Sequence, residues 1–226
     1  SIAGEVIEVG KSVSRFSVGD RVACGGGGYA SHAEVNYVPI NLVVKIPKNV
    51  DFISACYTTV GAIAMQGVRQ GNVAIGENIA VIGLGLVGQL TSQILKAAGC
   101  LVIGIDVKSY PLEVASGSSN WSLDYALKAD DRSLVSKINT ITNGIGVDKV
   151  IVTAASNNSK PIILGAEILR DRGTLVIVGS TKIDIPRSVF YEKEIDVKFS
   201  RSYGPGRYDV KYEEQGIDYP VGYVRW

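Results

Sequence analysis

A glycine-rich turn is the feature of this sequence that points most directly to chemistry. Gly83, Gly85 and Gly88 match the pattern G-x-G-x-x-G between an apolar segment and an amphipathic one. In a dinucleotide site the first glycine permits a tight turn, the second lets a pyrophosphate approach the backbone, and the third lets the helix pack on the sheet. We expect the free backbone N–H groups of Leu86 and Val87 to face the phosphates at the positive end of the helix dipole.

An acidic residue stands where such a site needs one. Asp106 ends the next apolar segment, close to the spacing of about 20 residues at which a carboxylate binds the adenosine ribose. Its negative charge would repel a 2′-phosphate, so the sequence favours NAD over NADP. Lys108, two residues later, weakens that preference and leaves NADP as the second option.

Two other interpretations of the turn stay open at this stage. It could be an ordinary strand-to-helix turn in a sheet that binds no ligand. It could also belong to an S-adenosylmethionine-dependent methyltransferase, which places a glycine-rich turn and an acid at similar positions. That class does not require the third glycine, and it does not usually carry a β unit before the turn.

The segments around the turn alternate between strand and helix patterns. The strand at 79–82 leads into a helix whose apolar face carries Leu86, Leu90, Ile94 and Ala97 and which Gly99 terminates. Further strands are predicted at 101–106, 125–127, 147–153, 173–178 and 195–199, and helices at 112–115, 131–142 and 160–169. The helix at 131–142 is expected to start with Asp130 or Asp131 as its N-cap. This alternation predicts an α/β doubly wound parallel sheet.

The ends of the chain have a different character. Short strand patterns at 2–9, 18–23, 31–39 and 42–46 predict an antiparallel β unit, and a helical pattern over 52–70 follows it. After Ser200 the chain is rich in tyrosine and turns at Gly204-Pro205-Gly206. We expect this aromatic tail, which includes Tyr223 and Trp226, to pack on the β unit.

Composition excludes several classes of protein. The chain has 226 residues and a formal net charge of +1, so it lacks the positive excess that binds nucleic acid. Its longest apolar stretch is about half of a ~20-residue membrane span. Three separate cysteines, Cys24, Cys56 and Cys100, indicate reduced thiols in the cytoplasm rather than a disulfide framework.

Together these motifs resemble one family along nearly the whole chain. It is the medium-chain dehydrogenase/reductase superfamily, also called zinc-type alcohol dehydrogenase-like. The matching segments are 3–10, Val18-Gly19-Asp20-Arg21-Val22, 29–34, 42–47, 81–88 and 142–148. Segments 202–209 and 218–226 resemble the bi-domain oxidoreductases, in which a second, fused oxidoreductase domain follows. The chain has no initiator methionine and opens on a strand pattern, so we interpret it as a fragment without the family's N-terminus.

The resemblance implies a Rossmann domain beside a partial GroES-like catalytic domain. The domains are expected at 1–57 for the GroES-like part, 58–199 for the NAD(P)-binding part, and 200–226 for a segment that returns to the catalytic domain. A nicotinamide cofactor is expected in the cleft between the lobes, with Thr58 to Val60 near the nicotinamide. The remaining cofactor-binding positions implied are Thr153, Val178, Gly179, Arg201 and Ser202.

The resemblance leaves zinc doubtful. Cys56 stands where zinc-dependent members have a third metal ligand, but Ser1 falls after the position of the family's histidine ligand. Cys24 is followed at once by four glycines instead of the four-cysteine lobe, which argues against structural zinc. We interpret Cys56 as a buried helix residue first and as a metal ligand second.

The candidates for catalysis are therefore Cys56, Tyr57 and Thr59. Tyr57 and Tyr203 carry hydroxyls that could hold a substrate oxygen or supply its proton, and each tyrosine could equally serve only in packing. His32, the only histidine, is predicted on a strand, with a surface role more typical than a proton shuttle.

The sequence thus predicts an NAD(H)-dependent oxidoreductase that transfers hydride between nicotinamide and an alcohol or carbonyl of a small, sugar-like substrate. A homo-oligomer is expected from the family. Two alternatives remain: a zinc-free quinone-reductase-like enzyme that uses NADPH, and a catalytically silent dinucleotide-binding module of a fused protein.

Overall fold

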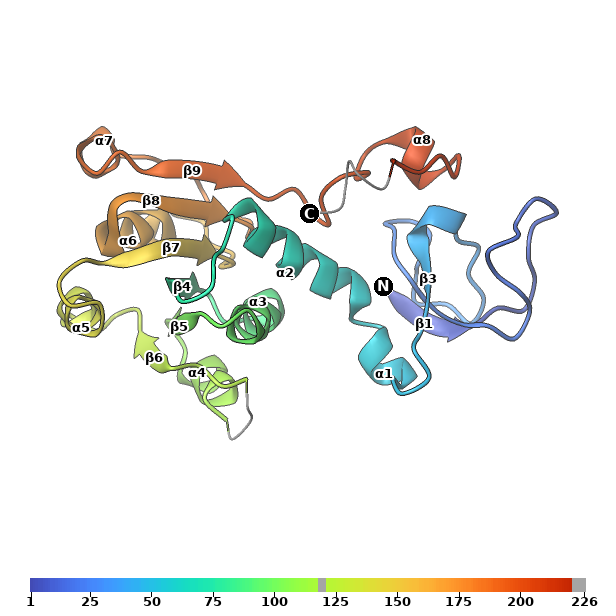
Figure 1. Cartoon of the computed structure of the whole chain (residues 1–226), viewed down its shortest axis with the longest axis horizontal. Helices are drawn as coiled ribbons and strands as arrows, with labels where there is room; N and C mark the ends of the chain where they lie inside the picture. Colours follow the sequence, from blue (N-terminus) through green and yellow to red (C-terminus); the bar gives the residue numbers. More distant parts are fainter. Residues whose placement is uncertain (118–120, 221–226) are drawn as a thin grey trace. The chain divides into compact units, whose positions relative to one another are not determined.

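The chain folds into two compact units (Figure 1). The computed structural model describes residues 1–117 and 121–220, so Tyr223 and Trp226 of the predicted tail lie outside the described residues. The smaller unit comprises Ser1–Ala62 and the chain from Tyr203 onward, and the larger one comprises Ile63–Ser202. Within the described ranges, no helix is long and apolar enough to cross a membrane.

The larger unit is built on a six-stranded sheet in which every neighbouring pair is parallel. The strand order is β6-β5-β4-β7-β8-β9. The strands are β4 (Asn78–Ile82), β5 (Leu101–Asp106), β6 (Tyr125–Lys128), β7 (Val147–Val152), β8 (Leu169–Ile177) and β9 (Asp196–Phe199). The order reverses between β4 and β7, so the topological switch point of the sheet lies between these two strands.

Helices cover both faces of this sheet, as Figure 1 shows. Side chains of β4 alternate: Val81 packs on the face covered by α2 to α4, whereas Ala80 and Ile82 pack on the face covered by α5 to α7. The helices are α2 (Thr58–Gln70), α3 (Leu86–Ala97), α4 (Ser109–Ala115), α5 (Leu134–Ile141), α6 (Lys160–Ile168) and α7 (Arg187–Glu192). The predicted doubly wound α/β fold is confirmed.

Helix α3 starts and ends where its sequence indicates. Gly85 is its N-cap, and Gly99 adopts a positive φ of 79° just beyond its last turn. The N–H of Gly99 donates to the carbonyl of Lys96, and the N–H of Cys100 donates to that of Leu95. This pair of bonds is the Schellman motif, which glycine favours because it has no Cβ to strain the left-handed backbone.

The smaller unit contains an antiparallel sheet in the order β1-β2-β3. Phe16, Val22, Cys24 and Ala30 form the centre of its core. Its elements are β1 (Ile2–Glu5), β2 (Arg21–Cys24), a 3-10 turn η1 (Ile40–Leu42), β3 (Val43–Lys45), α1 (Phe52–Ala55) and α8 (Val210–Glu213). This sheet is consistent with the predicted partial GroES-like domain.

The tyrosine-rich segment, residues 203–220, packs within the smaller unit. The side-chain amide of Asn41 donates to the carbonyl of Tyr212 in α8, across a distance of 2.9 Å. The rings of Tyr212 and Tyr219 stack with their centroids 5.5 Å apart. Aromatic packing, the simpler role expected of these tyrosines, therefore describes this pair.

One strand prediction for the smaller unit was wrong. Segment 31–39 is not a strand, because the Asn36 side chain accepts from the N–H of Ser31 and donates to the carbonyl of Ala33, both at 3.0 Å. These local bonds replace a strand ladder. The helical pattern over 52–70 corresponds to two helices, α1 and α2, and the Thr58 hydroxyl donates to the carbonyl of Ala55 at their junction.

In the larger unit, the helix predicted over 131–142 begins later, at Leu134, with Ser133 as its N-cap. Asp131 instead accepts hydrogen bonds from the N–H and the hydroxyl of Ser133 and pairs with Lys137. The short helices α7, in this unit, and α8, in the smaller unit, were not predicted.

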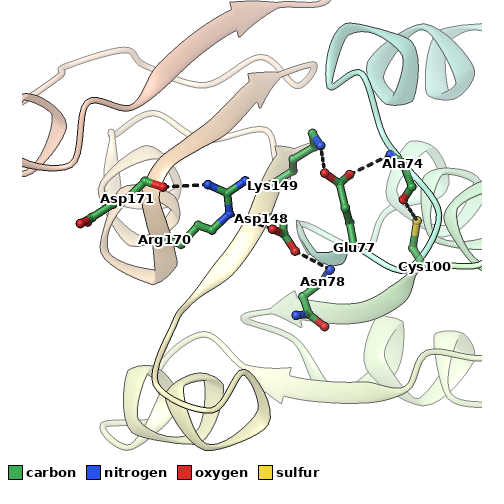
Figure 2. A network of polar contacts seen from close by, with 8 residues as sticks. All are labelled: Ala74, Glu77, Asn78, Cys100, Asp148, Lys149, Arg170 and Asp171. Atoms are coloured by element: carbon green, nitrogen blue, oxygen red, sulfur yellow. Dashed lines mark hydrogen bonds and ion pairs between the residues drawn. The ribbon is translucent and has the colours of Figure 1, made fainter.

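Charged side chains join the strands at the amino edge of the sheet (Figure 2). The Lys149 ammonium of β7 pairs with Glu77, whose other carboxylate oxygen accepts from the N–H of Ala74 at 2.8 Å. Next to it, the Arg170 guanidinium pairs with Asp148 at 2.8 Å. This network holds the start of β4 against β7 and β8.

Candidate functional site

The structure gathers most of the predicted cofactor-binding residues at the carboxyl edge of the parallel sheet. Strands β4 to β9 all run toward this edge, so residues that end them or follow them lie along it. These residues are Gly83 after β4, Asp106 at the end of β5, Thr153 after β7, Val178 and Gly179 after β8, and Arg201 and Ser202 after β9. Lys108 follows β5, and Leu86 and Val87 open α3.

Two of the three glycines in the turn are required by packing. Gly83 has a φ of +95°, and a Cβ on it would lie 2.6 Å from the Cα of Ala154. A Cβ on Gly88 would lie 2.0 Å from the carbonyl oxygen of Gly83, which is too close for any side chain. These positions therefore serve the close approach of the turn to β7 and to α3.

Gly85 is different, because no atom lies within 4 Å of the position that its Cβ would occupy. Its φ of −67° is accessible to any residue, so neither strain nor crowding explains the glycine. The N–H groups of the first turn of any helix have no intrahelical partner, and Gly85, as the N-cap of α3, provides no side-chain acceptor for them. An open backbone beside unsatisfied N–H donors fits a diphosphate.

Asp106 is held by two backbone groups. Its Oδ2 accepts from the N–H of Leu84 at 2.7 Å, and its Oδ1 accepts from the N–H of Lys108 at 2.8 Å. A carboxylate oxygen can accept more than one hydrogen bond, so both oxygens keep capacity for ribose hydroxyls. The carboxylate thus also orders the two loops around it.

Thr153 and Gly179 shape the neighbouring part of the edge. The Thr153 hydroxyl donates to the carbonyl of Gly83, which fixes the glycine-rich turn to the end of β7. A Cβ on Gly179 would lie 2.2 Å from the carbonyl oxygen of Ala154. The N–H groups of Val178 and Gly179 both donate to the carbonyl of Val152 at 2.9 Å. The structure therefore shows these residues supporting the backbone.

Ser200 was missed by sequence reasoning. Its hydroxyl is buried and has no hydrogen-bond partner among the described residues, although its N–H donates to Ile177 at 2.9 Å. It directly precedes Arg201 and Ser202, and Ser202 has a positive φ of 48°. A buried hydroxyl without a partner at this edge fits a site that takes a polar ligand. No residue pattern marks it, because a serine after a strand is common in turns.

The predicted catalytic residues lie in the smaller unit, around the junction of α1 and α2. The Cys56 thiol donates to the carbonyl of Ile53 at 3.0 Å, and Tyr57 is 45% exposed. The Thr59 side chain packs on Gly25, where an added Cβ would meet the Thr59 hydroxyl at 2.7 Å. Their catalytic roles stay predictions.

The donors among the described residues do not form a set that fits a metal. Among the described residues, no three His, Cys, Asp or Glu side chains come close enough together to hold an ion. Burial raises the pKa of the Cys24 thiol, and burial together with Glu77 raises that of Cys100. Both shifts of the pKa favour the neutral thiol in the protein without a metal. Cys56 as a metal ligand stays a prediction.

Tyr203 and His32 are the two remaining candidates for proton transfer. The Tyr203 hydroxyl donates to the Glu213 carboxylate, and burial together with this neighbour raises the pKa of Tyr203 above its usual range. It holds its proton too strongly to be a good acid at neutral pH. His32 was predicted on a strand, but it lies exposed in the turn that Asn36 organises.

Comparison with known families gives two matches. The family model for zinc-binding dehydrogenases matches residues 87–214, and that for the alcohol dehydrogenase GroES-like domain matches residues 1–48. The first covers the helix of the glycine-rich turn and most of the parallel sheet, and the second covers the sheet of the smaller unit.

Individual relatives of this chain include named dehydrogenases and reductases. D-guloside 3-dehydrogenase of Escherichia coli is 32% identical over 68% of this chain, which spans 43% of that relative's length. D-xylulose reductase A of Aspergillus oryzae is 27% identical over 92% of this chain, which spans 66% of its length. A crystal structure of a zinc-binding dehydrogenase from Sinorhizobium meliloti bound to NADP superimposes with a TM-score of 0.76 at 19% identity, over 96% of this chain and 72% of that one.

Proposed function

The chain belongs to the zinc-binding dehydrogenase family, and on that premise we propose that it is an oxidoreductase that transfers hydride between a nicotinamide dinucleotide and an alcohol or carbonyl carbon. The observation that carries the proposal is the open side of Gly85. In a turn whose other two glycines are crowded by backbone, this position alone faces empty space, at the amino end of a twelve-residue helix. A diphosphate accounts for that space.

The residues of the carboxyl edge divide the work of binding. The N–H groups of Leu86 and Val87 and the dipole of α3 bind the diphosphate, and Asp106 accepts hydrogen bonds from the adenosine ribose. The bound cofactor supplies or takes up the hydride. The charge of Asp106 favours NAD, and Lys108 provides the positive charge through which NADP is tolerated. Thr153, Val178, Gly179, Arg201 and Ser202 complete the wall on which the cofactor rests.

The substrate is proposed to be a small polyol or sugar-like carbonyl compound. The names of the guloside dehydrogenase and the xylulose reductase support this class, because each protein is similar to this chain over two thirds or more of the chain's length. Tyr57 and Thr59 are the proposed contacts for the substrate oxygen. Tyr57 is the better proton carrier of the two tyrosines, because the Glu213 carboxylate holds the proton of Tyr203.

Gly85→Ala tests the diphosphate site directly. Its added methyl group meets no protein atom, so we expect the melting temperature to stay within about 3 °C of the wild type. The same methyl group would occupy the space of the diphosphate, and we expect the dissociation constant for NADH to rise at least about tenfold, as measured by fluorescence titration.

Three outcomes are informative. If the variant binds NADH as tightly as the wild type, the diphosphate does not lie at this turn. If the wild-type chain binds neither NADH nor NADPH, the proposed function is wrong. If the full-length protein binds NADH but turns over no member of a panel of sugars, polyols and simple alcohols, the silent dinucleotide-binding module is the better description.

A further inference from the structure

The backbone of Leu84, between the first two glycines of the turn, is held by side chains through both its N–H and its carbonyl group. Its N–H donates to Asp106, and its carbonyl oxygen accepts from the side-chain amide of Gln89 at 3.1 Å. The Leu84 side chain is only 1% exposed, which anchors the same residue in the core. Two hydrogen bonds and a buried side chain therefore fix the orientation of Leu84.

Gln89 makes a second hydrogen bond from the same nitrogen. Its Nε2 also donates to the carbonyl oxygen of Pro111 at 2.8 Å, in the first turn of α4. Both partners are carbonyl oxygens, so only the amino end of the amide can satisfy them. Gln89 is partly buried, one turn into α3. One side chain therefore bridges the glycine-rich turn and the helix that follows β5.

Asp106 makes a matching bridge between the same two segments. It binds the N–H of Leu84 in the turn and the N–H of Lys108 in the loop that leads into α4. The turn and the loop are thus joined twice, by Asp106 on one side and by Gln89 on the other. Such a closed set of hydrogen bonds fixes the spacing of the two backbones more firmly than either bond alone.

We propose that Gln89 is a positioning residue of the dinucleotide site. It sets the distance between the backbone that receives the diphosphate and the loop that receives the adenosine ribose. This inference rests on the proposed function and adds a residue that contacts neither group. Without the Gln89 amide, both carbonyls would turn to water and the two loops would have to be ordered on binding, which lowers affinity.

The test compares two glutamines of the same helix. Gln89→Leu removes both hydrogen bonds at similar side-chain volume, whereas Gln93→Leu makes the same change one turn later at an exposed position. From the usual worth of a neutral hydrogen bond, we expect Gln89→Leu to raise the dissociation constants for NADH and ADP-ribose about three- to tenfold. Gln93→Leu should leave both within about twofold of the wild type.

Two readouts separate positioning from a general loss of structure. Adenosine meets only the ribose loop, so its affinity should fall less in Gln89→Leu than that of ADP-ribose, which spans both segments. In the coenzyme-free protein, backbone amide exchange should accelerate in residues 83–88 and 107–112 and stay unchanged in the central strands. Gln89→Asn, which is too short to reach both carbonyls, should reproduce both effects even if the leucine variant melts early.

The proposal is overturned if Gln89→Leu and Gln89→Asn bind ADP-ribose like Gln93→Leu. It is also overturned if adenosine and ADP-ribose lose affinity equally, because that result indicates a structural role alone. Both of these outcomes require a wild type that binds NADH. If the wild type binds no nicotinamide coenzyme, the proposed function itself is wrong, and the positioning role of Gln89 is wrong with it.

Discussion

Asp106 contributes more to the candidate site than a charge for the ribose. Both of its oxygens accept backbone N–H bonds, so removing the whole carboxylate would disturb the turn at Leu84 and the loop at Lys108 together. An alanine variant would mix a change in recognition with a change in loop geometry. Asparagine keeps one of the two acceptors and removes the charge, so it disturbs the backbone less than alanine does and is the sharper variant for this residue.

We expect Asp106→Asn to narrow the preference for NADH over NADPH. The loss of a charge-assisted acceptor should raise the dissociation constant for NADH about tenfold, whereas relief of charge repulsion should lower that for NADPH. Isothermal titration of both coenzymes against the variant and the wild type measures the ratio. A ratio that does not change would show that Asp106 does not face the 2′ position of the ribose.

At the scale of secondary-structure elements, the side chain of Lys193 caps the carboxyl end of α6. Helix α6 passes into β8 without an intervening loop, so its last carbonyls have no turn to satisfy them. The Lys193 ammonium donates to the carbonyls of Ala166 at 3.0 Å, Glu167 at 2.8 Å and Leu169 at 2.6 Å. A cation at this end also complements the helix dipole.

Lys193→Met should therefore lower the free energy of unfolding by about 2 kcal/mol, because hydrogen bonds from a charged donor are lost and the carbonyls stay partly buried. The matched control is Lys182→Met, at an exposed lysine after β8, which should change stability by less than about 0.5 kcal/mol. Urea denaturation of both variants measures the difference. Equal stability of the two variants would contradict the capping role.

The elements that the sequence predicts well are those with local signals. Helix α3 has both a glycine-rich start and a glycine after its end, and β4, β5 and β7 each contain an uninterrupted run of at least three apolar residues. Segment 31–39 has a strand pattern, but the side chain of Asn36 decides its structure. The short helices α7 and α8 have too few residues for periodicity to reveal them.

The residues of the candidate site also fall into those that the sequence predicts and those that it does not. Spacing alone identifies the glycine-rich turn and Asp106, because these positions need particular residue types. Gln89 and Ser200 could not be predicted from spacing. The partners of Gln89 are backbone carbonyls that only folding brings near it. The hydroxyl of Ser200 is distinguished only by its burial, which the sequence does not show. The structure also distinguishes Gly85, which faces open space, from Gly88, which packing requires.

At the scale of the larger unit, the two edges of the sheet have opposite characters. The carboxyl edge carries glycines, free N–H groups and a buried hydroxyl without a partner among the described residues, which suits a ligand but adds little stability. The amino edge is closed by the pairs Glu77–Lys149 and Asp148–Arg170 (Figure 2). Binding and stability should therefore respond to different substitutions.

Lys149→Met tests this separation. The Lys149 and Glu77 side chains are 9% and 19% exposed, so the variant leaves a largely buried carboxylate without its partner and should cost roughly 2–4 kcal/mol of stability. Adding Glu77→Leu removes that carboxylate and should recover part of the loss. Because the pair lies at the end of the sheet opposite the glycine-rich turn, the dissociation constant for NADH should stay within about twofold at temperatures where the variant is folded. A loss of affinity that persists in the stabilised double variant would mean that the two edges are coupled through the strands.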